Sequence, residues 1–444
     1  MPAGDILPGY SFVPAEKNID NTKLNSIVGQ ASIQPAFISA QTESTSSTTG
    51  DYYLLLKAGG TLAKIMSDNV ASSLASSSGF QSQIWSTRLR SYNAVGNPGF
   101  EVDQANVGNT LTNVATNTRI ADRWFLGKAG SVTGTINTQC SRISAGIKLP
   151  GTNFVITGNQ QLLQIGTTQA ALAAGDQVRM YQLLEGPQWR ELQGDVHSLS
   201  ILALSSTVAP YTFSVSIRDS PATKSLVNLL TIPTAATWTL LTIPNMPAFP
   251  VGNFSNGIGS LSYEMDICIA CGTTYQAPAT GSWQSGNFLG AAGMTNGLAA
   301  ANNLFFAFVQ HEPGPQCTTL IDCPFSGPNG NLEACQRYYQ KSYDLATAPG
   351  AITNAGSINF ITAITFNGIA IPIRFHKTMA KVPTVTVYSS TGAINNIRDT
   401  SGGVDVAVSS IAIPGTSGYS GVNTSSNVTA GHSVLWHHTA DTGW

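Results

Sequence analysis

The amino-acid sequence predicts a mainly β protein built around a two-sheet β-sandwich. Several stretches place apolar residues at every second position, as strands with one buried face do. Turns rich in Gly, Pro and Asn separate these stretches, and no helical stretch lies between them, which argues against an alternating α/β fold. Only 10% of the residues are charged, against about 25% in an average protein, so hydroxyl and amide side chains supply much of the polar surface.

Length and charge limit the class of protein. A chain of 444 residues is too long for one ordinary core, and we divide it into an N-terminal segment (1–85), a sandwich domain (86–345) and a C-terminal β domain (346–444). The net charge of −2 and the lack of Lys/Arg runs argue against a nucleic-acid partner. No apolar stretch reaches about 18 residues and no signal-peptide pattern opens the sequence, so neither membrane insertion nor signal-directed secretion is expected.

The strands expected in the sandwich domain alternate regularly. The clearest is residues 211–218, in which Tyr211, Phe213, Val215 and Ile217 would face one way. Further strands are expected at residues 175–186, 197–205, 236–244, 261–272 and 303–314. Several such strands, connected by loops, predict a sandwich.

The N-terminal segment has too little apolar surface for a core of its own. Leu24, Ile27 and Val28 have helical spacing and predict one short amphipathic helix. Residues 52–57 and 61–65 are expected to form a hairpin around a Gly-Gly turn, with a second short helix after it. A lone hairpin is only marginally stable, so this extended segment is expected to fold against a partner or against its own copies.

The six cysteines are too sparse for a disulfide scaffold, and reduced thiols are expected. Cys268 and Cys271 lie in an alternating strand, where an offset of three places the two sulfurs on opposite faces and prevents them from sharing a metal ion. Cys317 and Cys323 flank a loop and would be able to pair in an oxidising environment; the sequence leaves this open.

Residues 331–343, NLEACQRYYQKSY, predict a short helix that connects the sandwich to the C-terminal module. Asn331 can cap it, and Glu333, Arg337 and Lys341 would follow one another on an exposed row at i, i+4 spacing. The inward stripe would consist of Leu332, Cys335 and Tyr339.

The order of these motifs resembles that of bacteriophage tail-fibre and appendage proteins. GYSFVPAEKNIDNTKLNSIV and the hairpin after it resemble their N-terminal attachment segment, over residues 1–75. NPGFEVDQ (97–104), ADRWF (121–125) and the closing LEACQRYYQKSY resemble a jelly-roll, carbohydrate-binding-like module of that family, over residues 92–345. One departure is His311, in VQHEPG, where an aliphatic residue is usual.

The remaining part of the chain continues the resemblance. INFITAITFNG, an Arg-Phe strand and PTVTVYS (383–389) resemble a C-terminal β module that often follows the sandwich module. Apart from the family, Thr384, Thr386 and Tyr388 alternate with valines, so one face of this strand is rich in hydroxyls, which suits water or sugar.

The resemblance implies a structural virion protein. It would be a homotrimeric tail, neck or capsid appendage that docks onto other virion proteins through residues 1–75 and recognises host-surface glycan without covalent chemistry. The sequence does not show which side chains of the docking segment, Tyr10 and Ser11 included, would contact another virion protein. The alternatives are a fibre that depolymerises polysaccharide and a purely architectural head or neck decoration.

Enzyme chemistry finds little support in the sequence. Glycoside hydrolysis needs two carboxylates that flank the bond. The candidate pairs are Glu101 with Asp103 and Glu264 with Asp266, each on one face of an expected strand. Such pairs are common structural accidents. No GxSxG, HExxH or P-loop pattern occurs, nor a repeat typical of long β-helices. We therefore expect a protein without catalytic residues.

Candidate binding residues come from the chemistry of sugar recognition, which combines aromatic faces with amide and charged groups. Trp283 lies in the turn-rich GSWQSGN and is expected to be the most exposed tryptophan. The other candidates are Trp189, Trp124, Trp238, Arg123, Gln188 and Asn287. No cofactor is expected apart from a structural calcium ion, for which the resemblance of NPGFEVD suggests Glu101 as an oxygen ligand.

Overall fold

The computed structural model describes residues 92–143, 146–148, 155–156, 158–194, 196–317 and 330–444, together with four short N-terminal strands. The chain divides into two compact units, Met1–Ile84 and Trp85–Trp444.

The first unit contains two strand pairs in its described residues. β1 (Asp5–Leu7) pairs with β2 (Tyr10–Ser11), and β3 (Tyr52–Leu56) pairs antiparallel with β4 (Leu62–Met66). The second pair confirms the hairpin expected from the sequence. The helix expected around Leu24 to Val28, and the one after the hairpin, lie outside the described residues.

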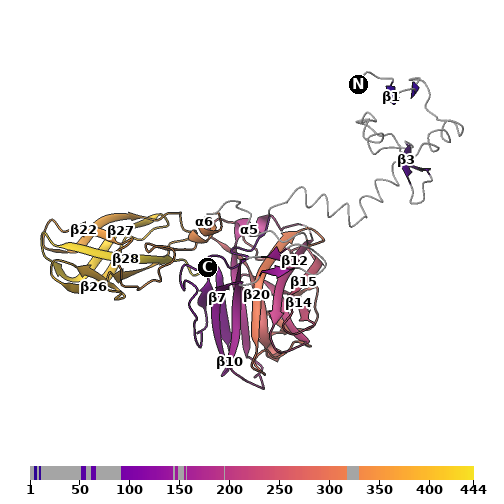
Figure 1. Ribbon diagram of the computed structural model, residues 1–444, viewed down its shortest axis with the longest axis horizontal. Helices are drawn as coiled ribbons and strands as arrows, with labels where there is room; N and C mark the ends of the chain where they lie inside the picture. Colours follow the sequence, from indigo (N-terminus) through magenta and orange to yellow (C-terminus); the bar gives the residue numbers. More distant parts are fainter. Residues whose placement is uncertain are drawn as a thin grey trace. The chain divides into compact units, whose positions relative to one another are not determined.

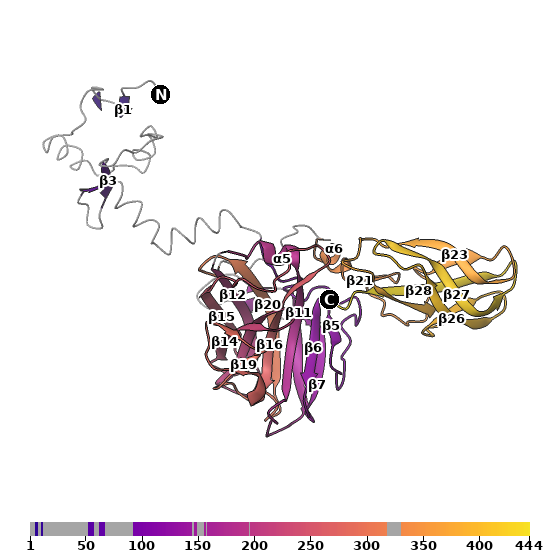
Figure 2. The same cartoon turned by 180° about the vertical axis from the view of Figure 1, so that it is seen from behind.

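The second unit begins with a sandwich of two antiparallel sheets. Figure 1 looks onto the five-stranded sheet, and Figure 2, from behind, onto the seven-stranded sheet. The five-stranded sheet has the order β15 (Thr239–Met246), β12 (His197–Ser205), β20 (Asn303–Pro313), β10 (Asn159–Thr167) and β7 (Thr135–Arg142). The seven-stranded sheet has the order β18 (Trp283–Ser285), β14 (Lys224–Ile232), β13 (Tyr211–Asp219), β16 (Leu261–Cys271), β11 (Gln177–Glu185), β6 (Trp124–Ala129) and β5 (Thr118–Ala121).

Alternation along the strands builds the core between these sheets. Tyr211, Phe213, Val215 and Ile217 are each at most 1% exposed and lie together in the main hydrophobic core, as their alternation predicts. Phe213 of one sheet meets Phe306 of the other edge to face, with ring centroids 5.7 Å apart. Complete burial of a side chain of this size contributes about 1.5–3 kcal/mol. The expected fold class, mainly β with a jelly-roll sandwich and a smaller C-terminal β module, is confirmed.

Short elements complete the sandwich. α5 (Gly186–Arg190) follows β11, and η1 (Thr273–Tyr275) leads into β17 (Gln276–Ala277), which pairs parallel with β19 (Gly290–Ala291). β8 (Ile147–Lys148) and β9 (Val155–Ile156) form a small hairpin. Among the described residues, no helix has the length and apolar character needed to cross a membrane.

The NPGFEVDQ motif is anchored by Asn97, a buried residue that forms several hydrogen bonds. Asn97 has a φ of 51° and is only 1% exposed. Its amide nitrogen donates to the carbonyls of Val102 and Asp122, at 2.7 and 2.9 Å. The Trp124 indole N–H donates to the Asn97 carbonyl at 3.0 Å. These hydrogen bonds fix Asn97 and the residues next to it against the core of the sandwich.

The C-terminal module is a second, smaller β body. Its strands are β21 (Tyr339–Lys341), β22 (Ile358–Ile361), β23 (Phe366–Arg374), β24 (Thr384–Ser389), β25 (Asn396–Asp399), β26 (Val404–Ala412), β27 (Gly418–Val428) and β28 (Ser433–Asp441). β28 is central, because β21, β22, β24 and β25 all pair with it. Trp436, fully buried, forms the middle of the core and donates its indole N–H to the Tyr419 hydroxyl at 3.2 Å.

The connector is only half helical, so the expected helix over 331–343 is wrong in its second half. α6 (Gly330–Gln336) ends before Arg337, whose guanidinium binds Glu185 of β11 at 2.5 Å. Tyr339–Lys341 then forms β21, at the edge of the C-terminal sheet. Lys341 is 5% exposed and donates to three carbonyls at 2.7–2.8 Å, instead of lying on an exposed helical row. Tertiary partners on both sides override the local helical spacing.

A β-bulge in β16 corrects the expectation for the two neighbouring cysteines. Cys268 lies opposite Arg179 and Ala270 lies opposite Val178, so Ile269 has no partner residue on β11. A bulge of this kind inserts one residue and resets the alternation. Cys268 and Cys271 therefore share one face of the sheet, where both pack in one small cluster with Leu289.

Candidate functional site

The outer face of the five-stranded sheet carries a row of partly exposed apolar side chains. Residue pairing places Leu204, Phe305, Leu162 and Gln139 side by side on four adjacent strands. Trp238 continues the register of β15 to lie beside Leu204, because Leu202 pairs with Leu240 and Ala203 with Thr239. All five side chains are half-buried. We call Trp238, Leu204, Phe305, Leu162 and Gln139 the outer row.

These residues face outward because their chain neighbours fill the core. Leu304 and Phe306, on either side of Phe305, are fully buried, as are Leu163 and Ala203. In a strand successive side chains point to opposite faces. Phe305 must therefore stand on the outer side.

Trp238 and Phe305 form the aromatic part of the outer row. Their ring centroids lie 6.3 Å apart, with the ring planes tilted by 58°. Trp238 also packs against a cluster on the same face that includes Leu202, Phe308 and Ile147 of the β8–β9 hairpin. Trp238 and Phe305 are thus packed against neighbouring side chains on part of their surface, and the remainder is exposed to solvent.

Amides flank the outer row on the neighbouring positions. Asn303, Gln164 and Asn137 lie side by side on β20, β10 and β7. The Asn137 amide nitrogen donates to Gln164 Oε1 at 3.1 Å, which fixes both amides. On the other side Gln160 reaches the Ser141 hydroxyl at 3.4 Å. This face offers neutral donors and acceptors next to apolar rings and contains no ionisable side chain among the residues named here.

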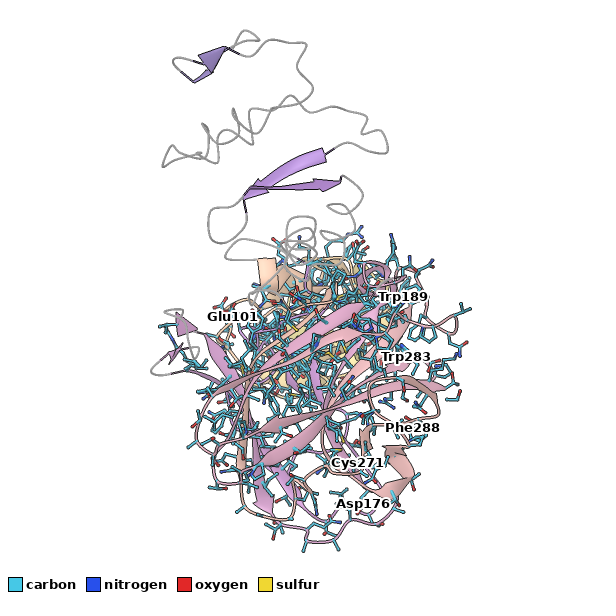
Figure 3. All side chains as sticks on the ribbon, turned by 90° about the vertical axis from the view of Figure 1, so that its right-hand side faces the viewer. Glu101, Asp176, Trp189, Cys271, Trp283 and Phe288 are labelled. Atoms are coloured by element: carbon cyan, nitrogen blue, oxygen red, sulfur yellow. The ribbon has the colours of Figure 1, made fainter. Side chains whose placement is uncertain are left out.

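Two of the tryptophans expected as platforms, Trp189 and Trp283, meet in a different place. Both contact Phe254, with ring centroids 5.8 and 5.7 Å apart. Phe249 lies among all three rings and is 9% exposed. Figure 3 shows Trp189 and Trp283 along one side of the sandwich. We call Trp189, Phe249, Phe254 and Trp283 the aromatic corner.

The side chains of the aromatic corner make most of their contacts within the protein. The Trp283 indole N–H is shared between the Pro247 and Ala248 carbonyls, at 3.2 and 3.0 Å. The Trp189 indole nitrogen is enclosed and has no acceptor among the described residues. Trp283 is half-buried, as are Trp189 and Trp238, so the expectation that it is the most exposed tryptophan stays a prediction. Phe249 and Phe254 pack against it, which its Gly- and Ser-rich neighbours in the sequence do not reveal.

Trp124 and Arg123 lie in the interior, which corrects their assignment as glycan-binding candidates. Trp124 is completely buried against Phe100, with ring centroids 5.2 Å apart. Arg123 is 1% exposed, stacks on the Tyr338 ring at 3.5 Å and donates to the Leu183 carbonyl at 2.6 Å. Burial lowers the pKa of Arg123. Neither side chain has surface left for a ligand.

The other polar candidates have structural partners. Asn287 is exposed, but its Oδ1 accepts a 2.6 Å hydrogen bond from Arg218 Nη1. Gln188 supports the entry to α5 by accepting from the Glu185 backbone N–H at 2.9 Å. Gln188 Oε1 also accepts a 3.4 Å hydrogen bond from Arg123 Nη2, so these two candidates meet in the interior, whereas Asn287 is bound to Arg218.

The two carboxylate pairs are held by other groups. Glu264 Oε1 lies 3.0 Å from Arg179 and 2.7 Å from Arg218, and Asp266 binds the same two guanidinium groups at 2.7 and 2.9 Å. Burial, with Asp266 beside it, raises the pKa of Glu264. Asp103 accepts from the backbone N–H groups of Asn106 and Gly108 at 3.1 and 3.0 Å.

Glu101 is exposed, and its role as a calcium ligand stays a prediction. The carbonyl of the preceding Phe100 already accepts from Cys140 Sγ at 2.9 Å and from the Asn159 amide at 3.2 Å. Within the described ranges, no three or more His, Cys, Asp or Glu side chains gather in a group that could hold a metal ion.

His311 takes part in a buried chain of hydrogen bonds, which explains a histidine in place of the expected aliphatic residue. Tyr263 donates its hydroxyl to His311 Nδ1 at 3.1 Å, and His311 Nε2 lies 2.8 Å from His197 Nδ1. His197 Nε2 reaches the Pro247 carbonyl at 3.0 Å. These bonds are all satisfied when both imidazoles are neutral and protonated at Nε2. Burial lowers the pKa of His197 to about 4.

Sequence reasoning missed Phe305, Leu162, Gln139 and Gln164. The signal was present in NQQLLQI (159–165), where Leu163 and Ile165 face the core and leave Gln160, Leu162 and Gln164 on the other face. A strand with one apolar face and one amide face is typical of a sheet that presents its outer side to a polar partner.

Comparisons with known proteins give no close relative. No protein-family model matches the chain, and no curated protein matches it. Among solved structures, TmCBM61 in complex with β-1,4-galactotriose is 10% identical, with 50% of this chain and 99% of that chain covered and a TM-score of 0.25. A family 11 carbohydrate-binding module from Clostridium thermocellum with a mixed-linked tetrasaccharide gives 9% identity, 47% and 98% coverage, and a TM-score of 0.25. The C-terminal family 22 carbohydrate-binding module of Xyn10B from Clostridium thermocellum gives 10%, 48% and 99%, and 0.23.

Proposed function

We propose that this chain is a non-catalytic subunit of a bacteriophage appendage, a homotrimeric fibre or spike that binds a neutral host-surface glycan through the outer row. The observation that carries the glycan part is the alignment of Trp238 and Phe305 with a border of amides on one face of the sheet. Apolar rings can pack on the C–H faces of a sugar, while fixed amides bind its hydroxyls.

The charge of this face supports an uncharged sugar. The outer row and its flanking amides carry only Trp, Leu, Phe, Gln, Asn and Ser side chains. An acidic polysaccharide would find no cation among these residues, whereas hydroxyls would find both donors and acceptors.

The virion and trimer parts of the proposal come from the sequence. The resemblance to appendage proteins spans the docking segment, the sandwich and the C-terminal module, and the N-terminal segment has too little apolar surface for a core of its own. Three copies would present three outer rows, and simultaneous binding would raise the effective affinity of weak sites by about 10²–10⁴-fold where the geometry permits it.

Binding without cleavage is supported by the carboxylates. Glu264 and Asp266 are each paired with two arginines, and Asp103 is occupied by backbone N–H groups. A hydrolase needs one carboxyl group as acid and a second as base or nucleophile, both facing the substrate.

The test uses the full chain on immobilised neutral and acidic bacterial polysaccharides, with a reducing-end assay run in parallel. We expect retention on a neutral polysaccharide, no new reducing ends, and a trimer mass in solution. New reducing ends would favour a depolymerase. Failure to bind any polysaccharide, combined with loss of particle incorporation when residues 1–75 are removed, would favour an architectural role.

A further inference from the structure

Three sulfur-containing side chains pack in one cluster beside β16, away from the outer row. The bulge at Ile269 places Cys268 and Cys271 on one face of the seven-stranded sheet, where they pack in one cluster. The Cys268 thiol donates to the Ala270 carbonyl at 3.2 Å, and the Cys271 thiol donates to the Gly272 carbonyl at 3.5 Å. Cys268 is completely buried and Cys271 is 6% exposed. Both thiols are free.

Met294 supplies the third sulfur. Its Sδ lies 2.3 Å from the point where a Cβ would stand on Gly290, and Cys271 Sγ lies 3.1 Å from the same point. A residue with a side chain at Gly290 would therefore displace these sulfurs. Leu289 and the half-buried Tyr275 pack around the group, and Figure 3 shows Cys271 on the side of the sandwich that also bears Phe288.

We propose that Cys268, Cys271 and Met294 form a binding site for one monovalent copper ion, Cu(I). Two thiolates and a thioether are soft ligands, and soft sulfur ligands select Cu(I) among the first-row metals. A structural zinc site needs four ligands, and within the described ranges no group of three or more His, Cys, Asp or Glu residues is available to supply them.

The backbone geometry admits a bridging metal as well as a disulfide. Cys271 pairs with Gln177 and Cys268 with Arg179, two positions apart on the partner strand. Two strand steps of about 3.3 Å separate the corresponding Cα atoms by roughly 6.6 Å. That is near the upper limit for a disulfide, about 6.8 Å. Two metal–thiolate bonds of about 2.3 Å each span a wider sulfur separation than one S–S bond of about 2.05 Å.

Binding involves no electron transfer. The two S–H bonds break, both protons pass to solvent, and two copper–sulfur bonds form from the thiolate lone pairs, while the thioether donates a lone pair without losing a proton. Because thiol ligands must lose their protons to bind the metal, copper affinity should rise with pH.

The test is an anaerobic competition between the reduced full chain and a chromophoric Cu(I) chelator. We expect the wild type to remove one equivalent of Cu(I), with X-ray absorption showing a shell of sulfur ligands. Cys268→Ser and Cys271→Ser should each weaken binding at least 100-fold, and Met294→Leu about 10-fold. Cys317→Ser, at a half-buried thiol outside the group, is the matched control and should retain binding.

Several results would overturn the proposal. They are a wild type that takes no Cu(I) from the chelator, equal loss in the Cys317→Ser control, or oxygen and nitrogen ligands in the absorption spectrum. Should a serine variant lose its circular dichroism spectrum, Met294→Leu and the wild-type absorption spectrum decide the matter. An intramolecular Cys268–Cys271 disulfide formed quantitatively with oxidised glutathione, without copper uptake, would instead assign the pair to redox chemistry.

Discussion

The outer row and the aromatic corner both contain half-buried tryptophans, yet their surroundings differ. In the aromatic corner the rings contact one another and Trp283 uses its N–H on backbone carbonyls. In the outer row Trp238 and Phe305 stand on a solvent-side sheet face with amides on the adjacent positions. Partial exposure alone therefore does not identify a sugar platform. The neighbours of a ring decide whether it stabilises the fold or meets a ligand.

The largest expected effect is on the stability of the aromatic corner. Phe249 contacts the rings of Trp189, Phe254 and Trp283, and also those of His197, Tyr263 and His311. Phe249→Ala should lower the free energy of unfolding by about 3–5 kcal/mol, because it leaves a cavity among these rings. Urea unfolding followed by tryptophan fluorescence measures the loss.

Phe305→Ala is the matched control, since it makes the same chemical change in the outer row. We expect it to cost less than about 1.5 kcal/mol of stability, because the ring is half-exposed, while glycan binding falls. Equal losses of stability for the two variants would remove the distinction between the two regions.

The second effect is a dependence of stability on pH that comes from His197 and His311, whose rings contact Phe249 of the aromatic corner. The pKa of His197 is lowered by burial to about 4, and that of His311 is lowered by burial and by His197. In the unfolded chain a histidine binds a proton below about pH 6.5. Below pH 6.5 the unfolded state therefore holds more protons than the folded state. The stability that the two neutral histidines provide is fully present above pH 6.5 and is lost as the pH falls toward 4.

Between pH 6.5 and pH 4, each histidine should lower the free energy of unfolding by about 1.4 kcal/mol for every unit by which the pH falls. His311→Leu should roughly halve the slope of unfolding free energy against pH, although it leaves the Tyr263 hydroxyl and His197 Nδ1 without their hydrogen-bond partner and lowers stability at pH 7. Glycan binding by the outer row, which has no ionisable side chain, should stay constant wherever the fold is intact. An unchanged slope in His311→Leu would contradict the role given to this pair.

The third effect concerns binding. Trp238→Ala should weaken glycan binding about 10-fold, a loss of about 1.4 kcal/mol, because it removes the larger ring of the outer row. Trp283→Ala, in the aromatic corner, should leave the affinity of the folded protein unchanged. Titration calorimetry with an oligosaccharide taken from the bound polysaccharide compares the two variants, and the reverse pattern would transfer the site to the aromatic corner.

How far the sequence predicts the molecule differs between strands and sites. Alternation is a local property, so the buried face of residues 211–218 follows from the residues alone. Whether a tryptophan faces the core or the solvent depends on strand order and register, which are properties of the whole sheet. Arg123 lies in the turn between β5 and β6 and has a φ of 73°, and Trp124 follows it at the start of β6. Nothing in the sequence ADRWF predicts that the chain reverses direction here.

The two cysteines of β16 teach the same lesson on a smaller scale. Strict alternation separates Cys268 from Cys271, and one unpaired residue, Ile269, brings them to the same face. The connector shows the opposite case, because residues 331–336 have helical spacing and form α6, whereas Tyr339–Lys341 is recruited by β28. Pairing partners that lie far away in the sequence decide both outcomes.

The smallest expected effect tests the amides that border the outer row. Gln164→Ala should weaken glycan binding about 2- to 5-fold, which corresponds to the loss of one ordinary hydrogen bond. Gln284→Ala on β18, next to Trp283, is the control and should have no effect on affinity. A greater loss from Gln284→Ala than from Gln164→Ala would argue against the outer row.

The central claim is that a glycan contacts Trp238 and leaves the tryptophans of the aromatic corner untouched. The most direct measurement is fluorine NMR of the full chain labelled with 5-fluorotryptophan, in which the seven tryptophans give separate signals assigned by single Trp→Phe variants. Addition of the bound oligosaccharide should shift the Trp238 signal and leave those of Trp189 and Trp283 in place. Shifts at Trp189 or Trp283, with Trp238 unmoved, would contradict the account.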